Sequence, residues 1–263
     1  MQYIDAHCHL DHDAFHSSGN EPHLQPTGRD DDLDAVIERM RSTGTIAVTH
    51  GTHAQSNQNQ LDLVAKYPDV LKAACGLDPF HAASESLEDH MAFLEQNKST
   101  LSAIGEIGLD LHYFGPATMN RQRQVFEAQL AFGEKNKLAC VIHTRKAVDD
   151  VLQTLPSFNG IHVLHFFLEK KHAKAALERN CFLSLPTVKS KDRTAIIKNA
   201  PLDRLLTETD SPYGWEKDET GNPQRNEPSN VHEVYDHIAL TLNKDLKDVR
   251  DQIIKNVEKV FKQ

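Results

Sequence analysis

Short apolar runs alternate with longer amphipathic segments along the chain, and this alternation limits the possible folds more than any other feature. Eight runs have the length and the β-branched or apolar content of buried strands: residues 3–5, 45–49, 71–76, 102–107, 139–142, 161–164, 181–185 and 205–209. Amphipathic helices are predicted between them, for example over residues 33–41, 87–96, 121–135 and 171–178. Repeated strand and helix units of this kind predict a parallel sheet with helices packed against it.

Eight strands without a Gly-rich phosphate loop after the first one favour a closed α/β barrel, the (β/α)8 TIM barrel, over a doubly wound nucleotide-binding sheet. The length of 263 residues fits one such barrel. Because no internal repeat or interdomain linker is evident, we expect a single barrel domain over residues 1–263. The polar stretch 12–32 is expected to be an enlarged loop after the first strand. This loop, with His12, His16 and His23, either is solvated or covers the barrel mouth as a lid.

Composition excludes several classes of protein. No run of eighteen apolar residues is present, and the first five residues lack the basic and apolar regions of a secretory signal. The four cysteines form no C-x-x-C pair, which argues against a thiolate zinc knuckle or a redox motif. We therefore expect a cytoplasmic protein with reduced thiols, no membrane association and no obligate protein partner. The net charge of −9 argues against broad electrostatic capture of nucleic acid, so a nucleic-acid substrate would need positive charge from bound metal.

Side chains that suit divalent metals follow the predicted strands at their carboxyl ends, which meet at one rim of a barrel. The first strand is followed by His7 and His9, and later strands by Glu106, His143, His165 and Asp210. Because alternate residues of a strand point to the same side, His7 and His9 are able to reach one ion. Mixed nitrogen and carboxylate ligands suit zinc, manganese or magnesium, and Glu106 is suited to bridge two ions about 3.5–4 Å apart.

Each of these residues also has a structural alternative. An isolated H-x-H pair is able to cap or to pack, and a single histidine at a strand end, such as His143 or His165, is commonly held by hydrogen bonds alone. Glu106 is able to pair with an arginine, and Asp210, which precedes Ser-Pro, is able to cap a helix. Random placement would seldom bring six such residues to the same end of successive strands. The conjunction therefore favours a site with two divalent metal ions.

The same segments resemble the TatD-type deoxyribonucleases of the amidohydrolase superfamily over nearly the whole chain. The matching segments are IDAHCHLD at 4–11, GEIGLD at 105–110, QRQVFEAQ at 122–129, VIHTR at 141–145, HFF at 165–167, LTETDSP at 206–212, RNEPSNV at 225–231, and Asn256. The resemblance implies a barrel fold and a DNA substrate. It also implies two sets of ligands that share Glu106 as a bridge: His7, His9, Glu106 and Asp210 for one metal, and Glu106, His143 and His165 for the other.

The chain departs from this family pattern after its third strand, where the family has G-x-H-P and this chain has Asp78 in place of the histidine. The resemblance places that histidine near the substrate phosphate. An acidic Asp78 would repel a phosphodiester unless it is protonated or faces metal, and His81 is a candidate to compensate. The segment after His165 also lacks the family's Ser-Gly pair.

The expected reaction is hydrolysis of DNA or another phosphoester by a metal-activated water. Asp210 is the candidate general base, with Glu208 as a supporting carboxylate. Arg145 and Arg225 are candidate phosphate contacts because a guanidinium donates two hydrogen bonds to one phosphate, whereas surface ion pairs are the alternative. Two other functions remain open. One is an ester or amide hydrolase, such as an aminoacyl-tRNA deacylase or a lactonase, which Asp78 fits better. The other is a catalytically silent metal-binding scaffold.

Overall fold

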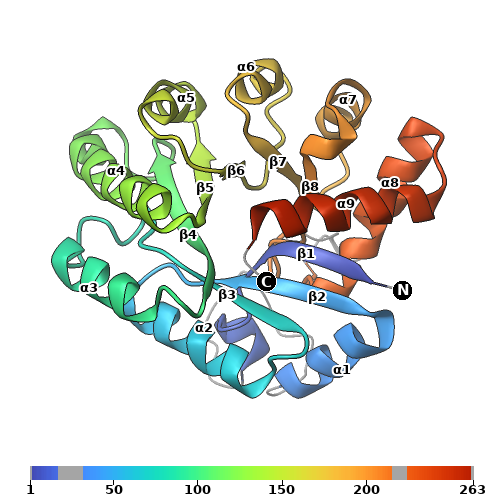
Figure 1. Ribbon diagram of the computed structural model, residues 1–263, viewed down its shortest axis with the longest axis horizontal. Helices are drawn as coiled ribbons and strands as arrows, with labels where there is room; N and C mark the ends of the chain where they lie inside the picture. Colours follow the sequence, from blue (N-terminus) through green and yellow to red (C-terminus); the bar gives the residue numbers. More distant parts are fainter. Residues whose placement is uncertain (1, 17–31, 215–223, 262–263) are drawn as a thin grey trace.

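Eight parallel strands alternate with helices around a ring in the computed structural model of the chain, which describes residues 2–16, 32–214 and 224–261 (Figure 1). Successive strands are hydrogen-bonded to one another in sequence order. The strands are β1 (Tyr3–Cys8), β2 (Thr45–His50), β3 (Leu71–Cys75), β4 (Leu101–Asp110), β5 (Ala139–Arg145), β6 (His162–Leu164), β7 (Phe182–Leu185) and β8 (Leu205–Thr207). This arrangement confirms the predicted (β/α)8 barrel.

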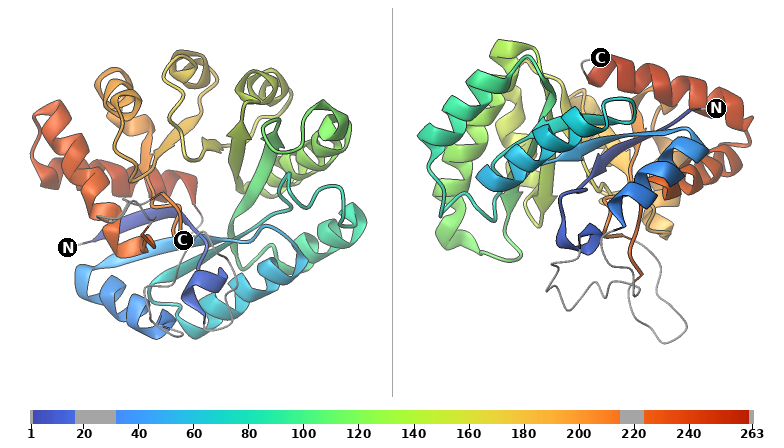
Figure 2. Two further views of the ribbon diagram at one scale, coloured as in Figure 1. Left: turned by 180° about the vertical axis from the view of Figure 1, so that it is seen from behind. Right: turned by 90° about the horizontal axis from the view of Figure 1, so that it is seen from below.

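Helices form an outer layer around the strands (Figure 2). They are α1 (Leu33–Thr43), α2 (Ala54–Lys66), α3 (Leu87–Asn97), α4 (Met119–Asn136), α5 (Val148–Thr154), α6 (Ala173–Glu178), α7 (Lys191–Asn199), α8 (His232–Leu242) and α9 (Leu246–Val260). The four helical segments that the sequence predicted correspond to α1, α3, α4 and α6. In α4 the residues Val125, Phe126 and Leu130 form the buried face, as their helical spacing requires. No helix in the described part of the chain is long and apolar enough to span a bilayer.

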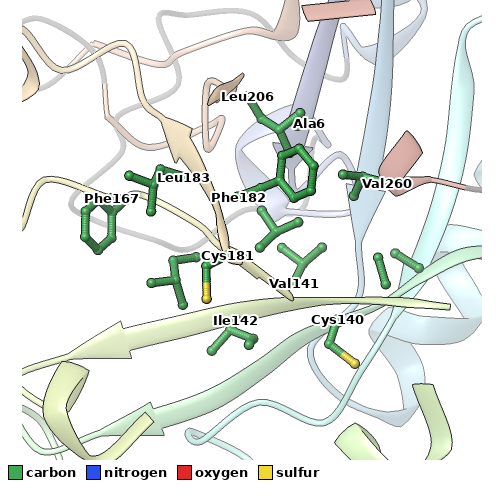
Figure 3. Close-up of a cluster of buried hydrophobic side chains, with 14 of the residues drawn as sticks. Ala6, Cys140, Val141, Ile142, Phe167, Cys181, Phe182, Leu183, Leu206 and Val260 are labelled. Atoms are coloured by element: carbon green, nitrogen blue, oxygen red, sulfur yellow. The ribbon is translucent and has the colours of Figure 1, made fainter. Parts of the chain in front are cut away.

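The core lies inside the ring and between the ring and its helices. Ile142, Leu183 and Leu206 come from three different strands and gather in one cluster (Figure 3). All ten residues of β4 are buried, as expected for a strand that is covered on both faces. Cys140 and Cys181 belong to the same core, and the four cysteines are buried and unpaired (Figure 3). The cysteines therefore contribute to packing rather than to a thiolate site.

The ring closes between β1 and the segment that follows β8. The backbone N–H of Asp210 donates to His7 O at 2.9 Å, and that of His9 donates to Ser211 O at 2.7 Å. The buried carboxylate of Asp5 accepts from the Thr209 backbone N–H at 2.8 Å and from the Thr209 hydroxyl at 2.5 Å. These bonds hold the first and last ligand-bearing segments side by side, although they are about 200 residues apart in the chain.

The strand β4 is longer than predicted, because it continues through Gly108 to Asp110. Gly108 pairs with His143 of β5 and has a φ of 144°. A Cβ at this position would lie 2.0 Å from His143 O, so only glycine allows the two strands to approach this closely. Two glycines in a short run obscure a strand in the sequence, because glycine has a low β propensity.

Only the ends of the predicted loop 12–32 belong to the described residues. Asp13–Phe15 form the 3-10 helix η1, and the His12 side chain accepts a hydrogen bond from the Ala14 N–H at 3.0 Å. His16 Nε2 lies 3.1 Å from Leu10 O. The prediction of a lid, and His23 with it, concerns residues outside the described ones.

Candidate metal centre

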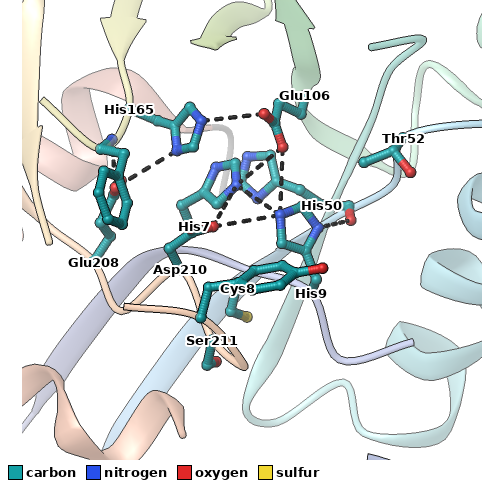
Figure 4. A network of polar contacts seen from close by, with 12 residues as sticks. His7, Cys8, His9, His50, Thr52, Glu106, His165, Glu208, Asp210 and Ser211 are labelled. Atoms are coloured by element: carbon teal, nitrogen blue, oxygen red, sulfur yellow. Dashed lines mark hydrogen bonds and ion pairs between the residues drawn. The ribbon is translucent and has the colours of Figure 1, made fainter. Parts of the chain in front are cut away.

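Glu106 lies in the middle of a cluster that contains all six predicted metal ligands. Its Oε2 is 3.4 Å from His7 Nε2 and 3.3 Å from His9 Nε2. Its Oε1 is 2.9 Å from His143 Nδ1 and 3.1 Å from His165 Nε2. Figure 4 shows Glu106 between His165 on one side and the pair His7 and His9 on the other. Each oxygen of this one carboxylate therefore faces a different pair of imidazoles.

Asp210 completes the cluster on the side of His7 and His9. Its Oδ1 is 3.6 Å from His7 Nε2 and 3.5 Å from His9 Nε2. Asp210 has a left-handed backbone with a φ of 55°, which Asp and Asn adopt more readily than other residues with a side chain. The hydrogen bond from its N–H to His7 O fixes this turn beside β1. Closure of the barrel thus brings the last ligand to the first two.

The cluster fits divalent cations by its own chemistry. Three overlapping groups of side chains each offer ligand atoms within 4.8 Å of one another: His7, His165 and Asp210; His7, His9 and Glu106; and Glu106, His143 and His165. Imidazole nitrogens mixed with carboxylate oxygens suit zinc or manganese, and carboxylates suit magnesium. The structure therefore brings the six predicted ligands together, although the group of His7, His165 and Asp210 takes members from both sets that the resemblance implied.

Hydrogen bonds to neighbouring groups orient the imidazoles. His9 Nδ1 lies 3.0 Å from His50 O, so its Nε2 is left to face the cluster. His143 Nε2 lies 3.0 Å from Asp110 Oδ2, so its Nδ1 faces Glu106. A histidine that binds metal usually makes such a bond through its other ring nitrogen, which fixes the tautomer and the direction of the ring. The surroundings of the cluster thus match those of a metal site.

Asp110 belongs to this arrangement, although the sequence analysis gave it no role. It is fully buried, its Oδ2 faces His143, and its Oδ1 accepts the backbone N–H groups of His112 and Tyr113 at 2.7 and 2.8 Å. Glu106 and Asp110 are both on β4, but a register shift between Ile104 and Ile107 and the positive φ of Gly108 interrupt the regular alternation of side chains between them. Asp110 was missed because the predicted strand ended at residue 107.

Replacing Asp110 by asparagine is expected to lower metal affinity or activity about 10- to 100-fold. Asparagine keeps an oxygen for the His112 and Tyr113 N–H groups, but its NH2 group is unable to accept from His143 Nε2. Titration of metal-free protein with zinc or manganese, followed by an activity assay, measures the change. Asp89→Asn, in the first turn of α3, is the control. Unchanged affinity and activity would show that Asp110 does not position His143.

Glu208 lies behind His165 rather than among the ligands. Its carboxylate is fully buried, accepts the Phe166 N–H at 2.5 Å, and lies 3.6 Å from His165 Nδ1 (Figure 4). Burial raises the pKa of Glu208, which the nearby His165 partly offsets. This position agrees with the supporting carboxylate that the sequence suggested, and it directs His165 Nε2 toward Glu106.

His50 is a further buried imidazole at the centre, at the end of β2. Its ring stacks on His7 at a centroid distance of 4.0 Å, and His165 stacks on His7 at the same distance. Burial, together with the neighbouring His9, lowers the pKa of His50 to about 3, so its ring is neutral. The predicted strand ended at residue 49, one residue before this histidine, so His50 was not recognised as a histidine at a strand end.

The electrostatics of the cluster keep Glu106 ionised. Burial opposes ionisation, but the charge and hydrogen bonds of His165, His143 and His7 hold the pKa of Glu106 well below its usual range. Burial would also lower the pKa of His143, yet hydrogen bonds to Asp110 and Glu106 raise it to about 9. Because an imidazole must lose its proton to bind a metal, we expect metal affinity to fall as the pH is lowered.

Of the two predicted phosphate contacts, Arg225 is committed to other partners. Its side chain is 4% exposed, and its guanidinium donates to Asp32 at 2.5 and 2.7 Å and to Glu227 at 2.9 Å. The ion pair that was the alternative is therefore the observed arrangement, and it does not support a phosphate contact. Arg145, at the end of β5, is exposed and donates to the Tyr113 hydroxyl at 2.8 Å.

Asp78 and His81 form a pair with each other in the loop after β3. Asp78 Oδ1 is 2.8 Å from His81 Nδ1 and accepts the His81 backbone N–H at 2.9 Å. The hydrogen bond to Asp78 raises the pKa of His81, whose side chain is 36% exposed, while that of Asp78 is 7% exposed. The acidic charge is thus turned inward and compensated by the histidine, which rests against His53 at a centroid distance of 4.4 Å.

Comparison with known proteins finds relatives that match most of the chain. The chain is 30% identical to the uncharacterized metal-dependent hydrolase YabD of Bacillus subtilis, over 91% of this chain and 96% of that protein. It is 28% identical to the 3'-5' ssDNA/RNA exonuclease TatD of Erwinia tasmaniensis, over 88% of this chain and 93% of that protein. A crystal structure of a TatD family hydrolase from Entamoeba histolytica has the same fold, with a TM-score of 0.84 and 20% identity, over 100% of this chain and 98% of that one.

The match to a family extends over almost the whole sequence. Residues 4–262 match the model of the TatD related DNase family, a range that includes all of the barrel strands except the first residue of β1, and all six residues of the cluster. The chain belongs to the TatD related DNase family.

Proposed function

We propose that this protein is a metal-dependent nuclease that hydrolyses phosphodiester bonds of DNA at the cluster around Glu106. The observation that carries the proposal is the convergence of four imidazoles, from the ends of β1, β5 and β6, on the buried carboxylate of Glu106, with the Asp210 carboxylate beside two of them. Two divalent ions, whether zinc, manganese or magnesium, are proposed to bind there. His7, His9, Glu106 and Asp210 would hold one ion, and Glu106, His143 and His165 the other.

The bound ions would supply a Lewis acid that makes water acidic and neutralises charge on the phosphate. The other roles in the reaction belong to side chains of the protein. Asp210 is proposed to accept the proton of the attacking water, because its carboxylate lies at the edge of the cluster with a side chain that is 13% exposed. Glu208 holds His165 in place. Arg145 is proposed to contact the phosphate, since a guanidinium carries five N–H donors and only one of them is needed for Tyr113.

The position of Asp78 supports a phosphodiester substrate over a neutral ester. The sequence raised the ester alternative because a free carboxylate would repel phosphate. In the structure this carboxylate is buried against His81, so the group nearest to solvent in the pair is an imidazole with a raised pKa. Relatives named as deoxyribonucleases or as a single-stranded DNA and RNA exonuclease agree with this choice of substrate.

Metal removal and reconstitution test the proposal. Protein treated with a chelator and then supplied separately with zinc, manganese or magnesium is assayed on end-labelled single-stranded DNA, on an activated carboxylic ester and on a misacylated tRNA. We expect cleavage of DNA that falls roughly 100-fold or more without metal and is restored by at least one ion. Turnover of the ester or the tRNA without cleavage of DNA would establish the alternative hydrolase. Bound metal with no turnover of any substrate would establish a silent scaffold.

A further inference from the structure

Exposed aromatic side chains gather at the mouth of the barrel. Four large apolar side chains are exposed among the described residues, namely Phe80 at 41%, Tyr113 at 56%, Tyr213 at 41% and Leu240 at 81%. Three of them lie next to the metal centre: Phe80 is 6.0 Å from His143 between ring centroids, Tyr113 contacts Phe80, and Tyr213 is 6.3 Å from His9. Only Leu240, on α8, lies away from this end. Neither the metal cluster nor the core accounts for the three aromatic rings.

Phe80 and Tyr113 form one continuous surface, which we call the stacking surface. Their ring centroids are 5.3 Å apart, and Phe114 supports Phe80 edge-on at 5.1 Å. The guanidinium of Arg145 lies 4.7 Å from the centre of the Tyr113 ring and donates to the Tyr113 hydroxyl. The loops after β3 and β4, together with the end of β5, thus place two exposed rings and one cation side by side.

Asp110 ties the stacking surface to the metal centre. One of its carboxylate oxygens orients His143, and the other accepts the backbone N–H of Tyr113 at 2.8 Å. The contact between Phe80 and His143 joins the other ring to the same ligand. Both rings are therefore connected to His143, one of the candidate metal ligands, through Asp110 or by direct contact.

We infer that the stacking surface of Phe80 and Tyr113 binds the base of a nucleotide whose phosphate lies at the metal centre, with Arg145 beside that phosphate. The inference rests on the proposed function and specifies its substrate. A chain with a net charge of −9 gains little from general attraction to a polyanion, so stacking and the metal centre must supply the affinity. Stacking is available to every base through its π face, but only where neighbouring bases do not already cover it. The surface therefore selects unstacked, single-stranded ends over duplex.

A series of dinucleotides with a single phosphodiester tests the inference without knowledge of cleavage polarity. The metal-loaded protein is assayed on thymidylyl-thymidine and on analogues in which the 5′ base, the 3′ base or both are replaced by an abasic residue. We expect wild type to prefer, by about 5- to 150-fold in kcat/KM, the substrates that carry one particular base. In Phe80→Ala, Tyr113→Ala and the double variant this ratio should fall toward one. Tyr113→Phe, which keeps the ring, should retain most of the ratio, and Leu240→Ala should match wild type.

Several results would overturn the inference. One is an equal rate for base-bearing and abasic substrates in wild type. Another is a base preference that survives the double variant. A third is a preference that Tyr213→Ala removes while Phe80→Ala and Tyr113→Ala do not, because the base would then lie at the other end of the centre.

A binding measurement separates this inference from the proposed function. A dinucleotide that contains 2-aminopurine loses fluorescence when its base stacks on an aromatic ring, whether or not its phosphodiester is cleaved. Quenching by wild type that disappears in Phe80→Ala and Tyr113→Ala supports the stacking surface, and equal quenching by all variants overturns it. If none of the dinucleotides is hydrolysed, the proposed function is refuted, and the quenching result still decides whether the stacking surface binds a base.

Discussion

Replacing Glu106 by glutamine is expected to abolish metal binding and to lower phosphodiester cleavage by about 1,000-fold or more. Each oxygen of Glu106 faces two imidazole nitrogens, and the residue is 6% exposed. Glutamine has the same shape, but it has no charge, and its NH2 group is no ligand for a cation. Elemental analysis of purified variant and wild-type protein, together with kcat/KM on single-stranded DNA, measures both effects.

The control for this substitution is Glu127→Gln, which removes a carboxylate from an exposed position of α4. It should leave metal content and activity at the wild-type level. Far-ultraviolet circular dichroism establishes that the barrel is intact in both variants. A Glu106→Gln protein that binds metal and cleaves DNA as wild type does would remove the basis of the proposed centre.

Replacing Asp210 by asparagine is expected to lower kcat by about 100- to 10,000-fold while the fold is retained. The amide is a weak metal ligand and does not accept the proton of the attacking water. The fold should persist because asparagine tolerates the left-handed backbone at this position, where φ is 55°. The bonds of this turn to His7 and Tyr213 are also made by backbone atoms alone. Steady-state kinetics and a thermal melt of the same preparation test the two parts.

A second variant at this position distinguishes the effect of losing the carboxylate from the effect of the residue type on the left-handed backbone. Asp210→Ala also removes the carboxylate, but it places a residue that disfavours the left-handed region at the turn, so its melting temperature should fall below that of Asp210→Asn. Asp149→Asn, whose side chain is 77% exposed on α5, serves as the control with unchanged kcat. Wild-type kcat in Asp210→Asn would refute the assigned roles.

The local pattern of apolar residues was sufficient to predict the order of strands and helices in the barrel. Each of the eight runs overlaps one of the strands β1 to β8, although several boundaries differ, because a strand covered on both faces must be a short apolar run whatever its partner is. The candidate ligands were predictable from the sequence because they follow the strands, and the parallel strands of a barrel all have their carboxyl ends at one rim. His7 and His9 were assigned to one ion from the period of a strand alone, and their Nε2 atoms lie 3.1 Å apart.

The local sequence pattern did not show which side chains contact one another. The sequence suggested Arg225 as a phosphate contact. In the structure its guanidinium pairs with Asp32 and Glu227, and Asp32 is far from it in the chain. His81 was a candidate to compensate the charge of Asp78, but only the turn after β3 shows that the two side chains meet. The partners of Arg225 were not visible in the sequence, and for Asp78 the partner was visible but the contact was not.

The sequence by itself determined that this chain forms a barrel of eight strands and helices and that six candidate metal ligands lie at one rim, because hydrophobic period and strand ends are local properties. Only the tertiary structure decided that Glu106 divides its oxygens between two pairs of imidazoles, and that Asp110 links His143 to an exposed aromatic surface. These relations arise from strand register and from closure of the ring between β1 and β8. Both are set by contacts between residues far apart in the chain, which no local pattern records.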